Sequence, residues 1–228
     1  MSKRDGKLWK AHAQAEFERW AETYDQSVLQ RLLFQRCYLK FIELILDGGS
    51  ANGNGELRLL DIGCGTGTFI SMLAETSLPV RAYGLDMAVR MCQIGAEKTR
   101  RLGIDDRIGF IVADSEHLPL EEGAFDVVTC SNSFHHYPHQ SVVVAQMYRA
   151  LRPGGRLIIL DGFRDNVIGW FIFDVCVAMV EKSVHHCTAS EMCDLLETAG
   201  FERIVQQKFG FWAPVLATVG IKPGGDST

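Results

Sequence analysis

The stretch that decides the fold is Leu59–Gly67, which reads Leu-Leu-Asp-Ile-Gly-Cys-Gly-Thr-Gly. An apolar run containing one carboxylate leads into three glycines at alternate positions. This pattern is typical of a buried strand that enters a tight turn before a helix, which we expect to open near Thr66. Since alternate glycines remove the Cβ atoms from one wall of the turn, a ligand can lie against the backbone, near the free N–H groups of the helix.

The nearest competing pattern is the dinucleotide-binding fingerprint, Gly-x-Gly-x-x-Gly. After Gly63 and Gly65 its third glycine would stand at position 68, where the chain has Thr68. Asp61 also disfavours this interpretation, because a carboxylate repels a pyrophosphate but accepts a hydrogen bond from a cationic amine. The stretch therefore favours a zwitterionic or cationic ligand, and a nicotinamide-dependent oxidoreductase becomes the weaker alternative.

Strands and helices alternate after a glycine-rich linker at residues 48–55. Short apolar runs separated by helices indicate a parallel sheet that is buried on both faces. The expected strands are Leu57–Ile62, Val80–Leu85, Ile108–Ala113, Phe125–Cys130 and Arg156–Leu160. The expected helices between them are Thr66–Glu75, Ala88–Leu102 and Gln140–Leu151.

The two ends of the chain add different elements. Thr188-x-x-Glu191 is a capping box, which predicts a helix that ends at Gly200. Phe201–Phe209 and Trp212–Val219 follow without a helix between them, near Gly210, so they must form an antiparallel pair. Before the linker, apolar residues at spacings of three and four predict two helices within about residues 14–46.

The glycine stretch resembles the first motif of the class I S-adenosylmethionine (SAM)-dependent methyltransferases. A helix stopped at Leu151–Gly155 by Pro-Gly-Gly ahead of an apolar strand strengthens the resemblance. Phe17–Asp25, which reads Phe-x-x-Trp-Ala-x-x-Tyr-Asp, resembles the opening motif of the ubiquinone and menaquinone biosynthesis methyltransferases (methyltransferase type 11). The resemblance covers about residues 14–219.

The resemblance implies an α/β fold: a Rossmann-like, doubly wound, seven-stranded sheet, mostly parallel, with a C-terminal antiparallel hairpin and an N-terminal helical arm. We expect residues 1–55 to form the arm and linker, and residues 56–228 to form the SAM-binding domain as a single structural unit.

In such a sheet the ligand lies at the carboxyl ends of the strands. Asp86 comes 21 residues after Gly65, close to the ~20 expected of a ribose-binding acid. Asp114 and Ser115 end the third strand and suit the adenine amino group and ring nitrogen. For both acids the alternative is a cap or a turn start. The residues expected to bind SAM are Tyr24, Asp61, Gly63, Cys64, Gly65, Gly67, Asp86, Met87, Asp114, Ser115 and Ser131.

Two of these assignments have specific alternatives. Met87 would lie on the adenine face, or it is a core methionine. Tyr24 would help to close the arm over the cofactor, or it belongs to a core aromatic stripe.

The sulfonium already activates the methyl group, so a base is needed only if the acceptor carries a proton. His135 and His136 follow the fourth strand and are the catalytic candidates, with a structural role as the alternative. Asp161 and the pair His185–His186 are further candidates for the base. We expect no metal, because adjacent residues such as His185–Cys187 cannot easily point at one ion and no further ligand spacing is present.

Two segments bear on the methyl acceptor. Ser131–Phe134 lacks the Asn/Asp-Pro-Pro-aromatic pattern of enzymes that methylate nucleobase or amide nitrogen. We therefore expect transfer to carbon or oxygen of a small metabolite, with other amines left open. Gly162–His186 is long and apolar, and we expect it to wall a pocket for an apolar or aromatic acceptor. Its most apolar part, Val167–Val180, is shorter than the about 20 residues of a membrane-spanning helix, although a lipid-like acceptor stays open.

Composition limits the alternatives that remain. A formal net charge of -5 leaves no basic excess for a nucleic-acid partner. Seven cysteines without a Cys-x-x-Cys pair argue against a disulfide framework or a zinc site, and favour a reducing, cytoplasmic location. A SAM-binding module without turnover, and a methyltransferase that acts on a macromolecule, are the rival functions. The sequence does not indicate the oligomeric state or the identity of the acceptor.

Overall fold

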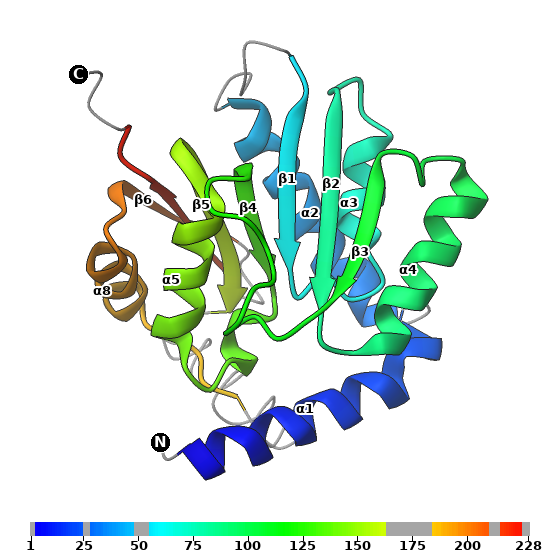
Figure 1. Cartoon of the computed structure of the whole chain (residues 1–228), viewed down its shortest axis with the longest axis horizontal. Helices are drawn as coiled ribbons and strands as arrows, with labels where there is room; N and C mark the ends of the chain where they lie inside the picture. Colours follow the sequence, from blue (N-terminus) through cyan, green and yellow to red (C-terminus); the bar gives the residue numbers. More distant parts are fainter. Residues whose placement is uncertain (1–2, 25–27, 48–54, 163–183, 210–214, 225–228) are drawn as a thin grey trace.

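The computed structural model describes residues 3–24, 28–47, 55–162, 184–209 and 215–224. A seven-stranded sheet in the order β3-β2-β1-β4-β5-β7-β6 lies between helices (Figure 1). The strands are β1 (Leu57–Ile62), β2 (Val80–Asp86), β3 (Ile108–Val112), β4 (Phe125–Ser131), β5 (Leu151–Gly162), β6 (Glu202–Phe209) and β7 (Val215–Ile221). The helices are α1 (Lys3–Tyr24), α2 (Val28–Asp47), α3 (Thr68–Ala74), α4 (Val89–Leu102), the 3₁₀ helix η1 (Phe134–His136), α5 (Gln140–Ala150) and α8 (Ala189–Ala199).

The strand order creates a switch point at the centre of the sheet. From β1 the chain proceeds outward through β2 to β3, then returns to β4 on the other side of β1 and continues to β5. Asp61 in β1 therefore has Gly84 of β2 on one side and Thr129 of β4 on the other. Because ligands bind outside the carboxyl ends of the strands at such a point, this topology positions the site.

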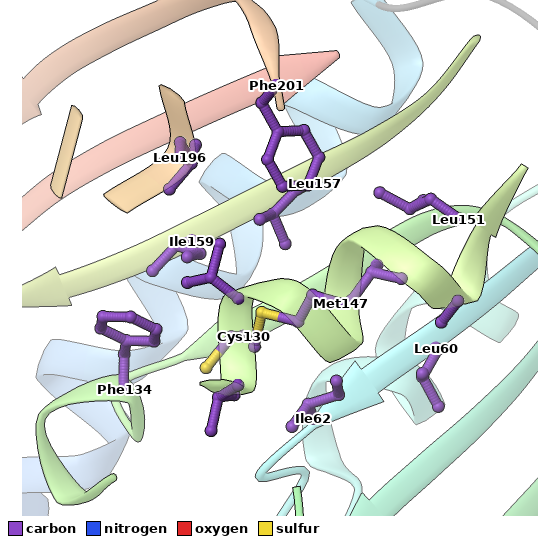
Figure 2. Close-up of a cluster of buried hydrophobic side chains, with 14 of the residues drawn as sticks. Leu60, Ile62, Cys130, Phe134, Met147, Leu151, Leu157, Ile159, Leu196 and Phe201 are labelled. Carbon is purple, nitrogen blue, oxygen red and sulfur yellow. The ribbon is translucent and has the colours of Figure 1, made fainter. Parts of the chain in front are cut away.

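Both faces of the sheet are buried, which explains its nearly continuous apolar runs. On one face, α5 packs on β4 and β5 and α8 packs on β6 and β7, and Met147 of α5 is fully buried in the cluster that they share (Figure 2). On the other face, α2 and α3 contribute Phe41 and Leu73 to a second cluster. Successive residues of β1 point to opposite faces of the sheet, so Leu60 packs in the first cluster and Leu59 packs in the second.

The expected α/β architecture is confirmed, and the strands agree closely with their predicted ranges, β1 without any shift. β5 is the exception, because it begins at Leu151 rather than at Arg156. Leu151 pairs with Phe125 of β4, and a register shift separates this pair from the pair Val127–Arg156. The Pro-Gly-Gly segment therefore lies within β5, at the irregularity between these two pairs.

The helix after the glycine stretch begins at Thr68, two residues later than expected at Thr66. Its N-cap is Gly67, whose φ of 68° is left-handed and therefore outside the helical region.

The C-terminal elements are confirmed. The amide of Glu191 donates to Thr188 Oγ1 at 3.1 Å, and the amide of Thr188 donates to Glu191 Oε2 at 2.8 Å, so both halves of the capping box are formed. The helix ends at Gly200, whose φ is 97°. β6 and β7 are antiparallel, with β7 inserted between β5 and β6, so β6 is the edge strand on this side of the sheet and β3 is the edge strand on the other side.

Both helices of the N-terminal arm are confirmed, but α1 begins at Lys3, well before the expected position near residue 14. It runs across the ends to which the arrowheads of β1 and β2 point (Figure 1). α2 is held on the sheet by Arg156 of β5, which donates to the carbonyls of Leu44 and Ile45.

Several expectations lie outside the described residues: most of the linker, the chain around Gly210, and residues 163–183 of the predicted acceptor wall. Within the described ranges, no helix combines the length and the apolar character that crossing a bilayer requires.

Candidate cofactor and active site

A cavity opens where the carboxyl ends of β1 to β4 face α1. Its empty volume is about 730 Å³, a figure that includes the open solvent at its mouth. The residues that line it are Lys10, Ala13, Phe17, Gly63, Gly65, Leu85, Asp86, Met87, Met91, Ala113, Asp114, Ser115, Ser131, Asn132, Ser133, His136, Tyr137 and Pro138.

The three glycines after β1 all have left-handed backbones, but they lie against different parts of the protein. Gly63 and Gly65, with φ of 72° and 52°, line the cavity. A Cβ on Gly63 would lie 2.2 Å from Ser133 Oγ, so the loop after β4 also needs this glycine. Gly67 does not line the cavity, and a Cβ there would lie 2.5 Å from the Phe110 ring. The structure therefore assigns Gly67 to packing of the turn on β3.

Asp86 faces the ligand space and also caps the backbone of neighbouring residues, which are the two roles that its position in the sequence suggested. It lines the cavity, and its carboxylate also accepts hydrogen bonds from Gly65 N and Ala88 N, both at 2.9 Å. Burial raises the pKa of Asp86, although these amide donors counteract the shift. Because each carboxylate oxygen can accept more than one hydrogen bond, ribose hydroxyls can still bind. Asp86 thus fixes the glycine loop against the start of α4 while facing the ligand space.

Asp61 is buried behind the glycine loop. Thr129 Oγ1 donates to its Oδ1 at 2.8 Å, but desolvation dominates and raises the pKa of Asp61 to about 7. It lines a smaller cavity next to the first, together with Cys64. The two cavities share the lining residues Gly63, Gly65, Ser131 and Asn132. An ammonium group placed beside Asp61 would favour the charged carboxylate and counteract this shift.

Asn132, which follows β4, has a left-handed backbone with φ of 47°. Its amide N–H donates to the Leu160 carbonyl at 2.8 Å, and its side chain donates to Ser131 Oγ at 3.0 Å. A non-glycine residue held in this region costs energy, and such residues cluster at functional sites. The strained turn brings Ser131 and Asn132 to the boundary between the two cavities.

Asp114 and Ser115 lie at the opposite end of the main cavity, with Met87 also in its lining. Lys10 of α1 reaches this end and places its Nζ 2.7 Å from Asp114 Oδ2 and 2.7 Å from Glu116 Oε2. Burial alone would raise the pKa of Asp114, but the Lys10 ammonium outweighs it and holds that pKa below its usual value. Sequence reasoning missed Lys10. The helical spacing of Lys10, Gln14 and Phe17 was the signal that could have marked it.

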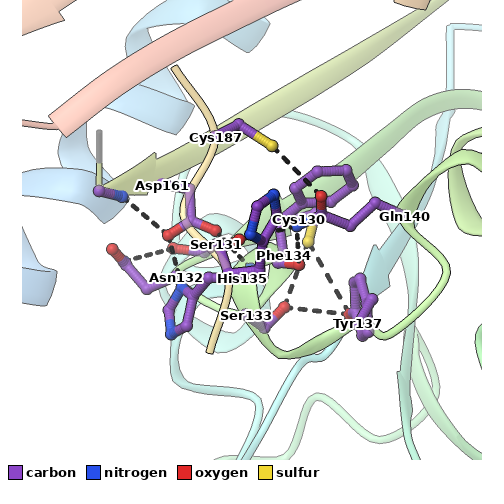
Figure 3. A network of polar contacts seen from close by, with 12 residues as sticks. Cys130, Ser131, Asn132, Ser133, Phe134, His135, Tyr137, Gln140, Asp161 and Cys187 are labelled. Carbon is purple, nitrogen blue, oxygen red and sulfur yellow. Dashed lines mark hydrogen bonds and ion pairs between the residues drawn. The ribbon is translucent and has the colours of Figure 1, made fainter. Parts of the chain in front are cut away.

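The two catalytic candidates take different places. His136 lines the cavity, and its ring meets Phe17 edge to face with centroids 5.0 Å apart. His135 is buried, and its Nδ1 lies 2.6 Å from Asp161 Oδ1, while its backbone amide donates to Asp161 Oδ2 at 2.8 Å (Figure 3). Burial would raise the pKa of Asp161, but His135 and His186 outweigh it and lower that pKa.

His186 joins this pair from the segment before α8. Its ring stacks on His135 with centroids 4.3 Å apart and planes 20° apart. Ligand atoms of His135, Asp161 and His186 lie within 4.8 Å of one another, a convergence that sequence spacing could not show. His185 contributes only backbone, its amide donating to the His135 carbonyl at 2.8 Å. The expected absence of a metal stays a prediction.

Tyr137 and Ser133 are further residues that the sequence did not mark. The Tyr137 hydroxyl lies 3.1 Å from Ser133 Oγ, which donates to the Ile62 carbonyl at 3.3 Å (Figure 3). Both side chains line the main cavity beside Gly63. Burial raises the pKa of Tyr137 well above its usual value, so the hydroxyl keeps its proton and acts as a neutral hydrogen-bonding group.

Of the residues expected to bind SAM, the main cavity contains Gly63, Gly65, Asp86, Met87, Asp114, Ser115 and Ser131, and the smaller cavity adds Asp61 and Cys64. The side chain of Tyr24, at the end of α1, lies outside the described part of the structure.

Comparisons with known proteins find similar methyltransferases. A family model described as "Methyltransferase domain" matches residues 60–159. Methyltransferase GfsG of Streptomyces halstedii is 32% identical over 150 residues, which cover 64% of this chain and 52% of that protein. A demethylmenaquinone methyltransferase of Thermus thermophilus is 34% identical over 145 residues, 64% of this chain and 63% of that protein. The chain thus spans between about half and two thirds of these relatives' lengths.

Among solved structures, the [4+2]-cyclase SpnF has a similar fold, with a TM-score of 0.67 and 20% identity over 82% of this chain and 81% of that one. The family match includes the glycine loop, Asp86 and Asp114. Residues 60–159 therefore match a methyltransferase domain, and the chain is similar to methyltransferases named for ubiquinone and menaquinone biosynthesis, which supports SAM as the cofactor.

Proposed function

We propose that the protein transfers the methyl group of SAM to carbon or oxygen of a small apolar or aromatic metabolite. The observation that carries the proposal is a single cavity with Asp86 and Asp114 on one side, the glycine loop in the middle and His136 among its walls. Its apolar lining, which includes Phe17 and Met91, favours an acceptor of the same character. The demethylmenaquinone relative is named for an acceptor of the small-molecule class.

The residues fit SAM by their chemistry. Asp86 would accept from the ribose hydroxyls, and Asp114 would accept from the adenine amino group. Gly63 and Gly65 would receive the amino-acid tail against bare backbone, and the buried Asp61 would pair with its ammonium. SAM supplies a methyl group already activated on a sulfonium, so the protein has to position the acceptor and exclude water.

His136 is the proposed base when the acceptor carries a proton. The acceptor atom forms its bond to the methyl carbon as the carbon–sulfur bond breaks, and the sulfur keeps that electron pair. The proton of the acceptor passes to the His136 imidazole. His135, whose ring centroid lies 4.1 Å from that of His136, is oriented by its contact with Asp161.

A cytoplasmic location belongs to the same proposal. The six cysteines in the described part of the chain are free thiols, and Cys37, Cys92, Cys130 and Cys187 among them are buried. Unpaired thiols are typical of a reducing compartment.

Calorimetry with S-adenosylhomocysteine (SAH), followed by methyl transfer from labelled SAM to a panel of phenols, quinols and aliphatic alcohols, tests the proposal. We expect SAH to bind, NAD to leave its binding unchanged, and at least one member of the panel to be methylated. Binding of SAH without transfer to any acceptor would favour a SAM-binding module instead. Displacement of SAH by NAD would contradict the cofactor assignment.

A further inference from the structure

The short helix η1, which contains both catalytic candidates, is bonded to the segment before α8. The amide of His185 donates to the His135 carbonyl at 2.8 Å. The side chain of Gln140, the first residue of α5, donates to the Phe134 carbonyl at 3.2 Å and to the His185 carbonyl at 2.9 Å. Its Oε1 accepts from Cys187 Sγ at 3.3 Å (Figure 3). One glutamine side chain therefore joins η1 to the residues on both sides of position 186.

His186 lies in this segment and covers one face of the His135 ring. It is 3% exposed, and the two rings stack with centroids 4.3 Å apart and planes 20° apart. The contact with Asp161 holds the His135 ring at Nδ1 alone. Because the torsion that turns an imidazole about its bond to Cβ is broad, one contact at the ring edge does not fix the ring plane. The flat face of His186 supplies this second constraint.

The His135 ring lies in turn against His136. Their centroids are 4.1 Å apart and their planes meet at 48°, while Phe17 contacts the His136 ring edge to face. A base must have its nitrogen within hydrogen-bond reach of the proton that it takes. A displacement of about 1 Å at a reacting group can slow a reaction by about 100-fold. A tilt of the His135 ring would therefore change where His136 places its nitrogen atoms.

We propose that His186 is a positioning residue for methyl transfer. It fixes the plane of the His135 ring and through it the orientation of His136, while Gln140 keeps the segment of His186 against η1. The proposal rests on the proposed function, in which His136 takes the acceptor proton. Neither of the two cavities described above has His186 among its lining residues. His186 should therefore affect the rate of methyl transfer and not the affinity for SAH.

A shared metal ion is the competing role for His186. Ligand atoms of His135, Asp161 and His186 lie within 4.8 Å of one another. The nitrogen lone pairs of an imidazole lie in the plane of its ring, so two stacked rings that are nearly parallel do not direct them at one point. The stacking of His186 on His135 thus favours ring packing over joint coordination of an ion.

Single-turnover methyl transfer from labelled SAM, to whichever acceptor of the panel is methylated, measures the chemical step in the full chain. Two variants retain different halves of the imidazole: His186→Phe keeps a flat ring, and His186→Asn keeps polar atoms. We expect His186→Asn to lower the single-turnover rate by about 10-fold or more, with the acceptor KM and the SAH affinity changed by less than about 3-fold. His186→Phe should remain within about 3-fold of the unaltered rate, because a flat ring still covers His135.

Phe201→Leu is the control for lost stability. Phe201 follows the end of α8, is 4% exposed and meets the Tyr148 ring edge to face. This substitution should lower the thermal unfolding temperature and leave the single-turnover rate unchanged. A slower reaction in His186→Asn is then a result of lost positioning and not of a looser core.

Gln140→Met gives an independent test, because it removes the hydrogen bonds that join η1 to the segment before α8 and leaves every histidine in place. We expect the single-turnover rate to fall by about 3- to 10-fold. Gln206→Met is the matched control, since the Gln206 side chain donates to the Ala189 carbonyl of α8 at 2.8 Å. Its rate should equal that of the unaltered protein.

An unaltered rate in a folded His186→Asn protein would overturn the proposal. So would a loss in His186→Phe as large as that in His186→Asn, because the ring plane would then be irrelevant. One divalent cation per chain, found by elemental analysis and absent from the His186 variants, would replace positioning by metal binding. If the unaltered protein binds no SAH or methylates no acceptor, the proposed function fails, and this inference fails with it.

Discussion

The two walls of the cofactor cavity differ in how they are held. The sheet wall consists of strand ends that lie between two buried apolar layers, and its acid Asp86 is fixed by two backbone amides. The α1 wall is attached by side-chain contacts such as those of Lys10 and Gln14. This difference teaches that the sheet wall is held by the core of the protein, whereas the α1 wall depends on polar side-chain contacts with the loops at the strand ends.

The largest effect is expected at the reacting end of the sheet wall. His136→Ala should lower kcat by about 100- to 10,000-fold on whichever acceptor of the panel is methylated, because the base for the acceptor proton is removed. SAH affinity, measured by calorimetry, should change by less than about 3-fold. His12→Ala, at an exposed histidine of α1 outside the cavity lining, is the control. Full activity in His136→Ala would show that the acceptor loses its proton without this residue.

Asp61 should connect stability to pH. Its pKa of about 7 in the folded chain lies above the ordinary 3.8, so the folded state holds this proton more tightly than the unfolded state. The contribution of Asp61 to the free energy of unfolding therefore declines as pH rises from about 4 to 7, by at most about 4 kcal/mol, and levels off above pH 7.

Asp61→Asn should remove this decline and weaken SAH binding by about 10-fold or more, because the carboxylate for the ammonium is lost. Urea unfolding of the ligand-free protein at pH 5 and pH 8, with and without the substitution, measures the first effect. An unchanged pH profile in Asp61→Asn would show that another group titrates in this range.

Asp86→Ala should weaken SAH binding by about 10- to 100-fold, because two charge-assisted hydrogen bonds to the ribose are lost. The Gly65 amide also loses its acceptor, so thermal unfolding must be measured alongside calorimetry. Asp105→Ala, at an exposed acid before β3, is the control. If the Asp86→Ala protein is folded and binds SAH as tightly as the unaltered protein, the sheet wall does not supply the main contacts to the cofactor.

The smallest effect is expected on the α1 wall. Gln14→Ala removes one hydrogen bond to the Met87 carbonyl, which is worth about 1 kcal/mol or less. The equilibrium affinity for SAH should fall by less than about 3-fold, and this fall should come from faster dissociation of SAH. A loss as large as that of Asp86→Ala would mean that α1 binds the cofactor as firmly as the sheet does.

Much of the fold was predictable because its signals are local. β1 was predicted to the residue, since an apolar run bounded by glycines specifies a buried strand. The capping box at Thr188 and Glu191 formed as expected, because both halves lie within one helical turn. Asp86 was found by its spacing from Gly65, and the structure joins these two residues by a hydrogen bond.

Other features depend on residues far apart in the chain. No local pattern distinguishes β7 as the inner strand of the hairpin, because its position depends on pairing with β5. The prediction that no metal binds was based on residues adjacent in sequence, such as His185 and His186. In the structure, the ring of His186 stacks on that of His135, which lies about 50 residues earlier in the chain. The pairing of Lys10 with Asp114 spans 104 positions.

The sequence by itself determined the order of strands and helices, the glycine turn and the acids at the strand ends, because hydrophobic periodicity and backbone sterics act over a few residues. Only the tertiary structure decided which of those groups meet: Lys10 with two carboxylates, His135 with Asp161, and Asp61 with a dry environment that raises its pKa. Burial and ion pairing depend on what the rest of the chain places nearby, and that is a property of the folded molecule.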